Sequence, residues 1–337
     1  MALWPPDDYR KIRDGRLEDF ATVHSTVSSV SKLFELLGSF NEPKWAFRGQ
    51  GTDRVLAASI ERVAIRPGIA EDDVMRGFRR RAHQYVTDVP SRDDDLEWLA
   101  LMQHHGAPTR LLDWTRSPHV AAFFAAQSSN AANPFITTKP EKQADAPLAC
   151  CKESNAAKQM HLSCPHRGIK PFVIWAVDVD SVNAEAVAML GLAGANNDLS
   201  APENFRKIYW DQQPDELFLV AAVEPYRMNE RLTIQQGLFL MANRPLFSFR
   251  SCLAALLLHA SKENKPSAQW LHKIVVASET RLDVLRALNK LNINSATLFP
   301  GLDGFCQSLY VTVQIQEHEN WPGVSQTTDR ERWVRGI

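Results

Sequence analysis

The chain has 337 residues, of which 45% are hydrophobic and 23% are charged, and its formal net charge is −1 at pH 7. These values are ordinary for a globular protein, and they exclude a protein that binds polyanions over its whole surface. No apolar run approaches the roughly 18 residues of a membrane-spanning helix. The N-terminus lacks the basic start and apolar core of a secretory signal, and five cysteines argue against a disulfide framework. We therefore expect a cytoplasmic protein without membrane contact.

The N-terminal part of the chain reads as mainly helical. Apolar residues recur at helical spacing over residues 17–38, which predicts one helix that ends at Gly38. A short strand is predicted over residues 44–47. Residues 70–86 predict a helix with an arginine-rich face, which is either solvated or the contact for a polyanionic acceptor.

Arg48 follows the predicted strand and lies beside Gly49 and Gly51. A guanidinium offers a planar fork of donors to an anion, and glycine permits close approach. The alternative is that Arg48 pairs with a core carboxylate, for which Asp113 is the obvious candidate. Both interpretations predict that Arg48 and Asp113 lie close together.

The densest group of polar residues lies over residues 101–126. A helix beginning after residues 93–95 should end at Gly106, and the segment from Thr109 to Thr115 predicts a short buried strand. Ser117-Pro118 then opens an apolar helix, because proline is favoured at the first helical position.

Asp113 is predicted to sit among bulky apolar side chains, where a carboxylate cannot ionise without a partner. Arg110 and Arg116 are its nearest candidates in the sequence. The paired His104 and His105 add two titratable groups, but a hydrolase built on them would need a nucleophile that the sequence does not identify.

Residues 127–170 lack apolar periodicity, which predicts a long insertion or loop. The insertion contains Cys150, Cys151, His161, Cys164 and His166. These residue types suit zinc, but their spacing matches no standard zinc finger, so we expect no metal.

The second half of the chain mixes buried strands, helices and irregular stretches, which favours an α+β fold with a single globular domain around a mixed sheet. Strands are predicted over residues 171–179, 217–223 and 273–277, and helices over residues 182–190, 252–260, 280–291 and 304–317. A late strand over residues 231–241 would carry Gln235 and Gln236 against the edge of the core. The motifs of phosphate-binding loops, dinucleotide-binding folds, serine-hydrolase elbows and zinc proteases do not occur.

Four blocks of sequence, in order, resemble the FRG-domain family. They are Phe47-Arg48-Gly49, the run HGAPTRLLDWT at residues 105–115, RLTIQQGLF at residues 231–239 and LFPGLDGFCQSL at residues 298–309. The resemblance implies a lead-in over residues 1–24, an FRG domain over residues 25–310 with an insertion at about residues 130–168, and a tail over residues 311–337.

The order of the blocks is also distantly similar to ADP-ribosyltransferases, which implies a core of that type with a helical N-terminal part, a long loop insertion and NAD as co-substrate. Carried onto this sequence, the similarity implies catalytic roles for Arg48, Asp113, Thr115, Gln235 and Gln236, and NAD-binding roles for Arg48, Gly49, His105, Thr109, Arg110 and Trp114. The third block departs from the pattern, because glutamine cannot offset the positive charge of an oxocarbenium ion as a carboxylate does. Asp113 or Glu230 would have to substitute.

The leading functional expectation is an NAD-dependent ADP-ribosyltransferase that modifies a nucleic acid or a protein. Such an activity fits a bacterial toxin or an antiphage defence effector, with an antitoxin or regulator protein as a partner. One alternative is a non-catalytic nucleotide- or nucleic-acid-binding module. The other is an NAD glycohydrolase.

Overall fold

The computed structural model describes residues 12, 17, 23–63, 71–128, 170–192, 197–209, 217–244 and 248–316. The predicted insertion at residues 130–168, including its cysteine and histidine cluster, lies outside these residues. No helix in the described segments is long and apolar enough to cross a membrane.

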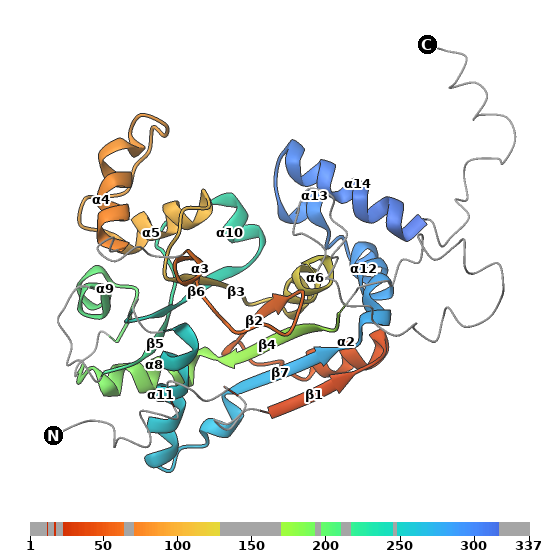
Figure 1. Ribbon diagram of the computed structural model, residues 1–337, viewed down its shortest axis with the longest axis horizontal. Coiled ribbons are helices and arrows are strands. Elements are labelled where there is room, and N and C mark those ends of the chain that lie inside the picture. The colour runs from red at the N-terminus through yellow and green to blue at the C-terminus, as the bar shows by residue number, and fades with distance from the viewer. Residues whose placement is uncertain are drawn as a thin grey trace, which may run out of the picture.

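Seven strands form one open sheet in the order β1-β7-β4-β2-β3-β6-β5, in which β1 and β7 run parallel and the other neighbours run antiparallel (Figure 1). The strands are β1 (Val23–Val27), β2 (Trp45–Gln50), β3 (Leu111–Thr115), β4 (Phe172–Asp178), β5 (Val220–Val223), β6 (Gly237–Ala242) and β7 (Leu271–Val276). The α+β prediction with a mixed sheet is therefore confirmed.

The helices precede, link and follow these strands. They are α2 (Val30–Gly38), α3 (Ser59–Arg62), α4 (Glu71–Ala82), α5 (Asp95–His104), α6 (Pro118–Ser128), α8 (Val179–Met189), α9 (Pro202–Tyr209), α10 (Glu230–Ile234), α11 (Phe249–Lys262), α12 (Arg281–Lys290), α13 (Ser295–Leu298) and α14 (Leu302–Gln316), with short 3-10 turns at Ser267–Gln269 and Ser278–Thr280.

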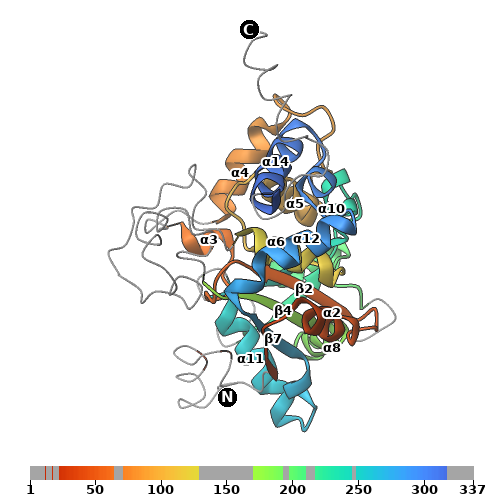
Figure 2. The ribbon, with the colours of Figure 1, turned by 90° about the vertical axis from the view of Figure 1, so that its right-hand side faces the viewer.

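Both faces of the central sheet are covered by helices. All seven residues of β4 are buried, and they alternate between two hydrophobic clusters: Val173, Trp175 and Val177 on one face, and Phe172, Ile174 and Ala176 on the other. Helices α2, α6 and α12 contribute to the second cluster, whereas α8 and α11 contribute to the first. Figures 1 and 2 show α6 and α12 on the opposite side of the strands from α11. Burial on both faces explains why β4 reads as a continuous apolar run.

The helix predicted over residues 17–38 is wrong in its first half. Residues 23–27 form β1, which pairs with β7 over five registered residues, and α2 begins only at Val30. The Ser29 hydroxyl accepts a hydrogen bond from the Lys32 N–H (3.4 Å) and so caps α2. The β-branched residues Val23, Thr26 and Val27 suit an extended strand once β7 provides a partner.

Candidate functional site

The sheet has a seam between β2 and β3. Strand β2 shares six registered pairs with β4 but only one, Phe47 with Thr115, with β3. At this seam the Nη1 atom of Arg48 donates a hydrogen bond to the carbonyl oxygen of Asp113. Two residues separated by 65 positions are therefore neighbours, as expected, although the contact is to the main chain of Asp113 and not to its carboxylate.

Burial lowers the pKa of the Arg48 guanidinium, and the nearby negative charge of Asp113 opposes that shift. The Nε atom of Arg48 is buried and has no hydrogen-bond partner among the described residues. Arg48 thus keeps an unused donor at the seam.

Asp113 is exposed, so the prediction that it is enclosed by apolar side chains is wrong. It alternates along β3 with the buried Leu112 and Trp114, and its side chain lies on the other face of the strand. Neither predicted arginine pairs with it: Arg110 binds Glu71, and Arg116 binds Glu224 (2.7 Å) and the Pro43 carbonyl (2.8 Å).

Gln103 holds the Asp113 carboxylate in place through a chain of hydrogen bonds. The Leu111 N–H donates to the Thr109 hydroxyl (3.2 Å), which donates to Gln103 Oε1 (2.5 Å), and Gln103 Nε2 donates to Asp113 Oδ2 (2.9 Å). The donor-to-acceptor direction of these three hydrogen bonds fixes which end of the Gln103 amide faces Asp113. Sequence reasoning missed Gln103; its one signal was a polar side chain at the end of an otherwise apolar helix.

Thr109, predicted to bind NAD, is completely buried, and its main chain is bound to Ser59 and Ile60. Its hydroxyl is already used by Leu111 and Gln103. Thr109 therefore acts through Gln103 and does not meet a ligand.

Arg110 is also enclosed, which contradicts a ligand-binding role. Its Nε forms an ion pair with the Glu71 carboxylate, and its Nη1 donates to the Asn243 carbonyl (3.1 Å). The guanidinium carbon lies 4.1 Å from the centroid of the Tyr209 ring. Only 4% of Arg110 is exposed. Its guanidinium connects the start of β3 to Glu71 on α4 and to Tyr209 on α9.

Gly49 and Trp114 likewise belong to the packing of the core. A Cβ atom on Gly49 would overlap the Ala121 carbonyl oxygen and lie 2.5 Å from the Ala125 nitrogen. The missing side chain therefore makes room for the backbone of α6, which fills the space that a ligand would need. Trp114 is 3% exposed, and its Nε1 atom has no partner in the described segments.

The two glutamines are on the turn between α10 and β6, so the late strand predicted over residues 231–241 is wrong in its first half and begins only at Gly237. The Asn229 side chain accepts a hydrogen bond from the Leu232 N–H (2.8 Å). This bond caps the N-terminus of α10, so the residues that follow Asn229 form a helix and not a strand. The side-chain amide of Gln235 donates a hydrogen bond to the Leu298 carbonyl (2.9 Å). The main-chain carbonyl of Gln235 accepts a hydrogen bond from the Thr115 hydroxyl (2.6 Å). Gln235 and Thr115 therefore join the second, third and fourth sequence blocks and have a structural role.

Gln236 differs from its neighbour because it is exposed and has a positive φ of 49°. Non-glycine residues with such backbone angles cluster at functional sites. Its carbonyl accepts from the Arg116 N–H (2.8 Å), which holds the turn beside the end of β3.

His104 and His105 stand at the C-terminus of α5, directly after Gln103, with their rings edge to face at 4.9 Å between centroids. His105 is exposed. Burial lowers the pKa of His104, and the charges of His105 and Arg231 lower it further. Arg231 of the third block lies with its guanidinium carbon 4.7 Å from the centroid of the Phe299 ring, which belongs to the fourth block.

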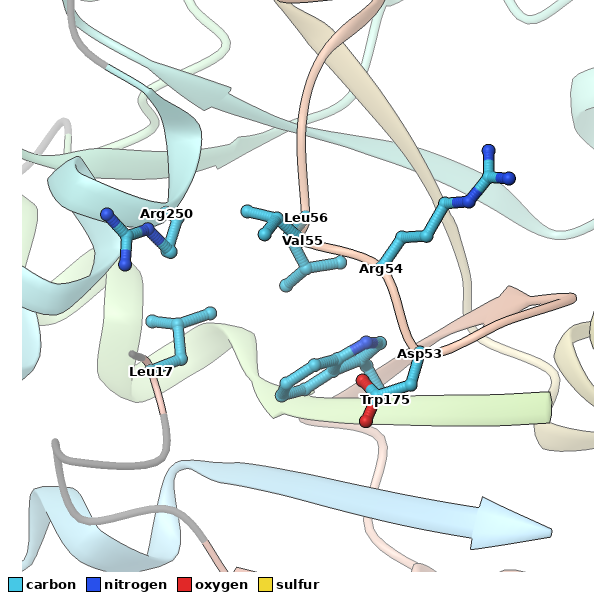
Figure 3. A pocket seen from close by; sticks show the side chains of 7 residues that line it. All are labelled: Leu17, Asp53, Arg54, Val55, Leu56, Trp175 and Arg250. Atoms are coloured by element: carbon cyan, nitrogen blue, oxygen red, sulfur yellow. The ribbon is translucent and has the colours of Figure 1, made fainter. Parts of the chain in front are cut away.

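Two cavities flank β2, and neither is lined by Arg48 or Asp113. The first, about 290 Å³, is lined by Leu17, Asp53, Arg54, Val55, Leu56, Trp175 and Arg250 (Figure 3). Figure 3 shows the Arg54 guanidinium pointing away from Trp175 and Arg250. The second, about 460 Å³, is lined by Phe40, Glu42, Pro43, Trp45, Phe47, Arg116 and Asp180. The Arg48–Asp113 site therefore lies apart from both hollows.

The fold and site define an α+β protein with an arginine and a carboxylate at a seam in a mixed sheet. A family model described as "FRG domain" matches residues 43–134, a stretch that includes β2, β3, Arg48, Gln103 and Asp113. This match supports the resemblance of residues 43–134 to the FRG-domain family. The comparisons with curated proteins and with solved structures returned no match.

Proposed function

We propose that the seam binds NAD and that the protein transfers ADP-ribose to a nucleic acid or a protein. The observation that carries the proposal is an exposed carboxylate, Asp113, held by Gln103 beside the charge of Arg48. A carboxylate so placed can offset the positive charge that develops on the ribose as its bond to nicotinamide breaks.

In this reaction the C1′–N bond of the nicotinamide ribose breaks, and its electron pair leaves with nicotinamide. A nucleophilic oxygen or nitrogen of the acceptor forms the new bond to C1′, and the acceptor's proton passes to solvent. Asp113 supplies charge stabilisation, Arg48 binds the anionic part of NAD, and Gln236 offers an amide for a ribose hydroxyl. An activity of this kind suits a toxin or antiphage effector that an antitoxin or regulator protein controls.

A second candidate is a non-catalytic nucleotide- or nucleic-acid-binding module. It is favoured by the third block, because the buried Gln235 is used in packing and residues 231–239 contain no aspartate or glutamate. An NAD glycohydrolase, with water as the acceptor, is the remaining alternative.

Labelled NAD⁺ separates these activities when RNA, DNA and protein acceptors are supplied. Label in a macromolecule indicates transfer, free nicotinamide alone indicates hydrolysis, and neither favours the binding module. We expect Asp113→Asn to lower turnover on the order of 100-fold, because the acceptor oxygen remains and the charge is lost. Arg48→Lys should be nearly as inactive as Arg48→Ala, because lysine lacks the planar fork.

Asp283→Asn and Arg206→Lys are matched controls on exposed helical surfaces and should keep wild-type turnover. Melting temperatures must be measured on the same variants. Activity losses that follow losses of stability in proportion would make Arg48 and Asp113 structural, and a wild type that neither binds nor consumes NAD⁺ would rule out the transferase.

Gln103 offers a separate test of how Asp113 is held. Gln103→Glu removes the donor to Asp113 and places a second negative charge beside it, so we expect turnover to fall at least about tenfold. Gln103→Met removes the hydrogen bond without adding charge and should lose less. If both folded variants retain wild-type turnover, Gln103 does not position a group that the reaction needs.

A further inference from the structure

The second cavity, of about 460 Å³, lies where the loop after α2, the start of β2 and the start of α8 meet the end of β3. Its lining consists of three aromatic residues, a proline and three charged residues, namely Phe40, Trp45, Phe47, Pro43, Glu42, Asp180 and Arg116. Small-molecule sites have volumes of about 300–1,000 Å³ and combine mainly apolar walls with a few polar groups. The cavity therefore has the size and the mixed lining of a binding site.

The aromatic walls of this cavity stand at right angles to one another. The Phe40 ring crosses the Trp45 ring at 81° with 4.9 Å between centroids, and it crosses the Phe47 ring at 87° with 5.6 Å between centroids. The face of an aromatic ring is its negative side, and cations bind over it. Perpendicular walls let a rounded cation meet ring faces from more than one direction, which a flat stack of rings would not allow.

A lysine beside the cavity already has a cation in such surroundings. Lys44 Nζ lies 5.6 Å from the centroid of the Trp45 ring and pairs with Glu42 (2.8 Å) and Asp178 (3.5 Å). The hydrogen bond to Glu42 raises the pKa of the Lys44 ammonium. Burial lowers the pKa of His272, whose ring contacts Phe40 and Trp45, so this imidazole adds no positive charge at neutral pH. The surroundings of Trp45 therefore favour a cation.

Negative charge outweighs positive charge around the cavity. Arg116 supplies the positive charge in the lining, and it is held by the Pro43 carbonyl (2.8 Å) and by Glu224 (2.7 Å). The charged lining residues and their ion-pair partners are four carboxylates and two cations, namely Glu42, Asp178, Asp180, Glu224, Lys44 and Arg116. Asp180 is exposed and has no ion-pair partner within the described segments, so its carboxylate is available to a ligand.

We propose that this cavity binds a quaternary or N-methylated ammonium ion between the rings of Phe40, Trp45 and Phe47, with the carboxylate of Asp180 beside it. Such an ion carries its charge on a rounded, apolar group, and aromatic faces are the surfaces that recognise it. A free small molecule and a trimethylated lysine side chain present the same chemistry. The cation site is separate from the seam, because neither Arg48 nor Asp113 lines the cavity.

Binding of choline to the full chain, titrated by saturation-transfer NMR of its trimethyl signal, tests the proposal without any turnover. We expect saturable binding of choline and at least about tenfold weaker binding of 3,3-dimethylbutan-1-ol, which has the shape of choline but no charge. Phe40→Leu keeps an apolar side chain but removes a ring face, so it should weaken choline binding about three- to tenfold. Asp180→Asn removes one exposed charge and should weaken it about threefold.

Asp283→Asn removes an exposed carboxylate on α12 that does not line the cavity, and it should bind choline like the wild type. An equal loss in Asp283→Asn would show non-specific charge attraction and overturn the proposal. Equal affinity for choline and its uncharged analogue would overturn it too, as would unchanged choline binding in Asp180→Asn or no saturable binding to the wild type. Because Asp180 is exposed, its variant should fold even if Phe40→Leu does not.

A short peptide that contains trimethyllysine is the companion probe. Tighter binding of this peptide than of choline identifies a protein side chain as the source of the cation, and weaker binding identifies a free molecule; both results support the cation site. Asp180→Asn should consume NAD⁺ at the wild-type rate, because Asp180 lies outside the seam. The cation site and the transferase proposal can therefore fail separately.

Discussion

Gly49→Ala should leave little stably folded protein. The added Cβ would overlap the Ala121 carbonyl oxygen, and both Ala121 and the nearby Ala125 nitrogen belong to the backbone of α6. Because a helix backbone cannot rotate away as a side chain can, α6 would have to move off β2, and overpacking of this kind costs about 3 kcal/mol or more. That is a large share of the roughly 5–15 kcal/mol that stabilises a typical protein.

The measurement is the melting temperature and soluble yield of Gly49→Ala beside Gly38→Ala. Gly38 lies at the end of α2, and a Cβ there meets nothing within 4 Å. The control should melt at or slightly above the wild-type temperature, because alanine favours a helix over glycine. A Gly49→Ala variant that melts within a degree or two of the wild type would show that α6 is not fixed against β2 as described.

Glu71→Gln should destabilise the fold by about 3–5 kcal/mol, because it leaves the charge of Arg110 buried without its counter-ion. The Asn243 carbonyl and the Tyr209 ring remain near Arg110, but neither carries a negative charge. Chemical denaturation of Glu71→Gln measures the loss directly. Asp73→Asn, an exposed position in the same turn of α4, should cost less than about 0.5 kcal/mol.

The double variant Glu71→Leu with Arg110→Met completes the test. Replacing both members of a buried ion pair by apolar groups is often close to neutral, so much of the stability should return. The double variant should also consume NAD⁺ like the wild type, since Arg110 is assigned to the core. If the double variant folds but no longer consumes NAD⁺, Arg110 belongs to the ligand site after all.

Local chemistry determined a good part of this protein. The helix stop at Gly106, with φ of 76°, and the start of α6 at Pro118 follow from residues whose backbone preferences are strong. The apolar run over residues 171–179 predicted a buried strand, and β4 is buried on both of its faces. The blocks around Arg48 and Asp113 predicted that these two residues meet, because both occupy motifs of one family and an arginine and an acid attract.

The tertiary structure decided what each polar residue does. Residues 23–27 became a strand because β7 supplied a parallel partner, although their spacing also fits a helix. The alternation of β3 sent Asp113 to the surface and Trp114 to the core, and a distant glutamate, Glu71, took Arg110. Gln103 entered the site through α5, where Thr109 donates a hydrogen bond to its side-chain oxygen. Such long-range pairings depend on which segments pack together, and no local pattern in the sequence records them.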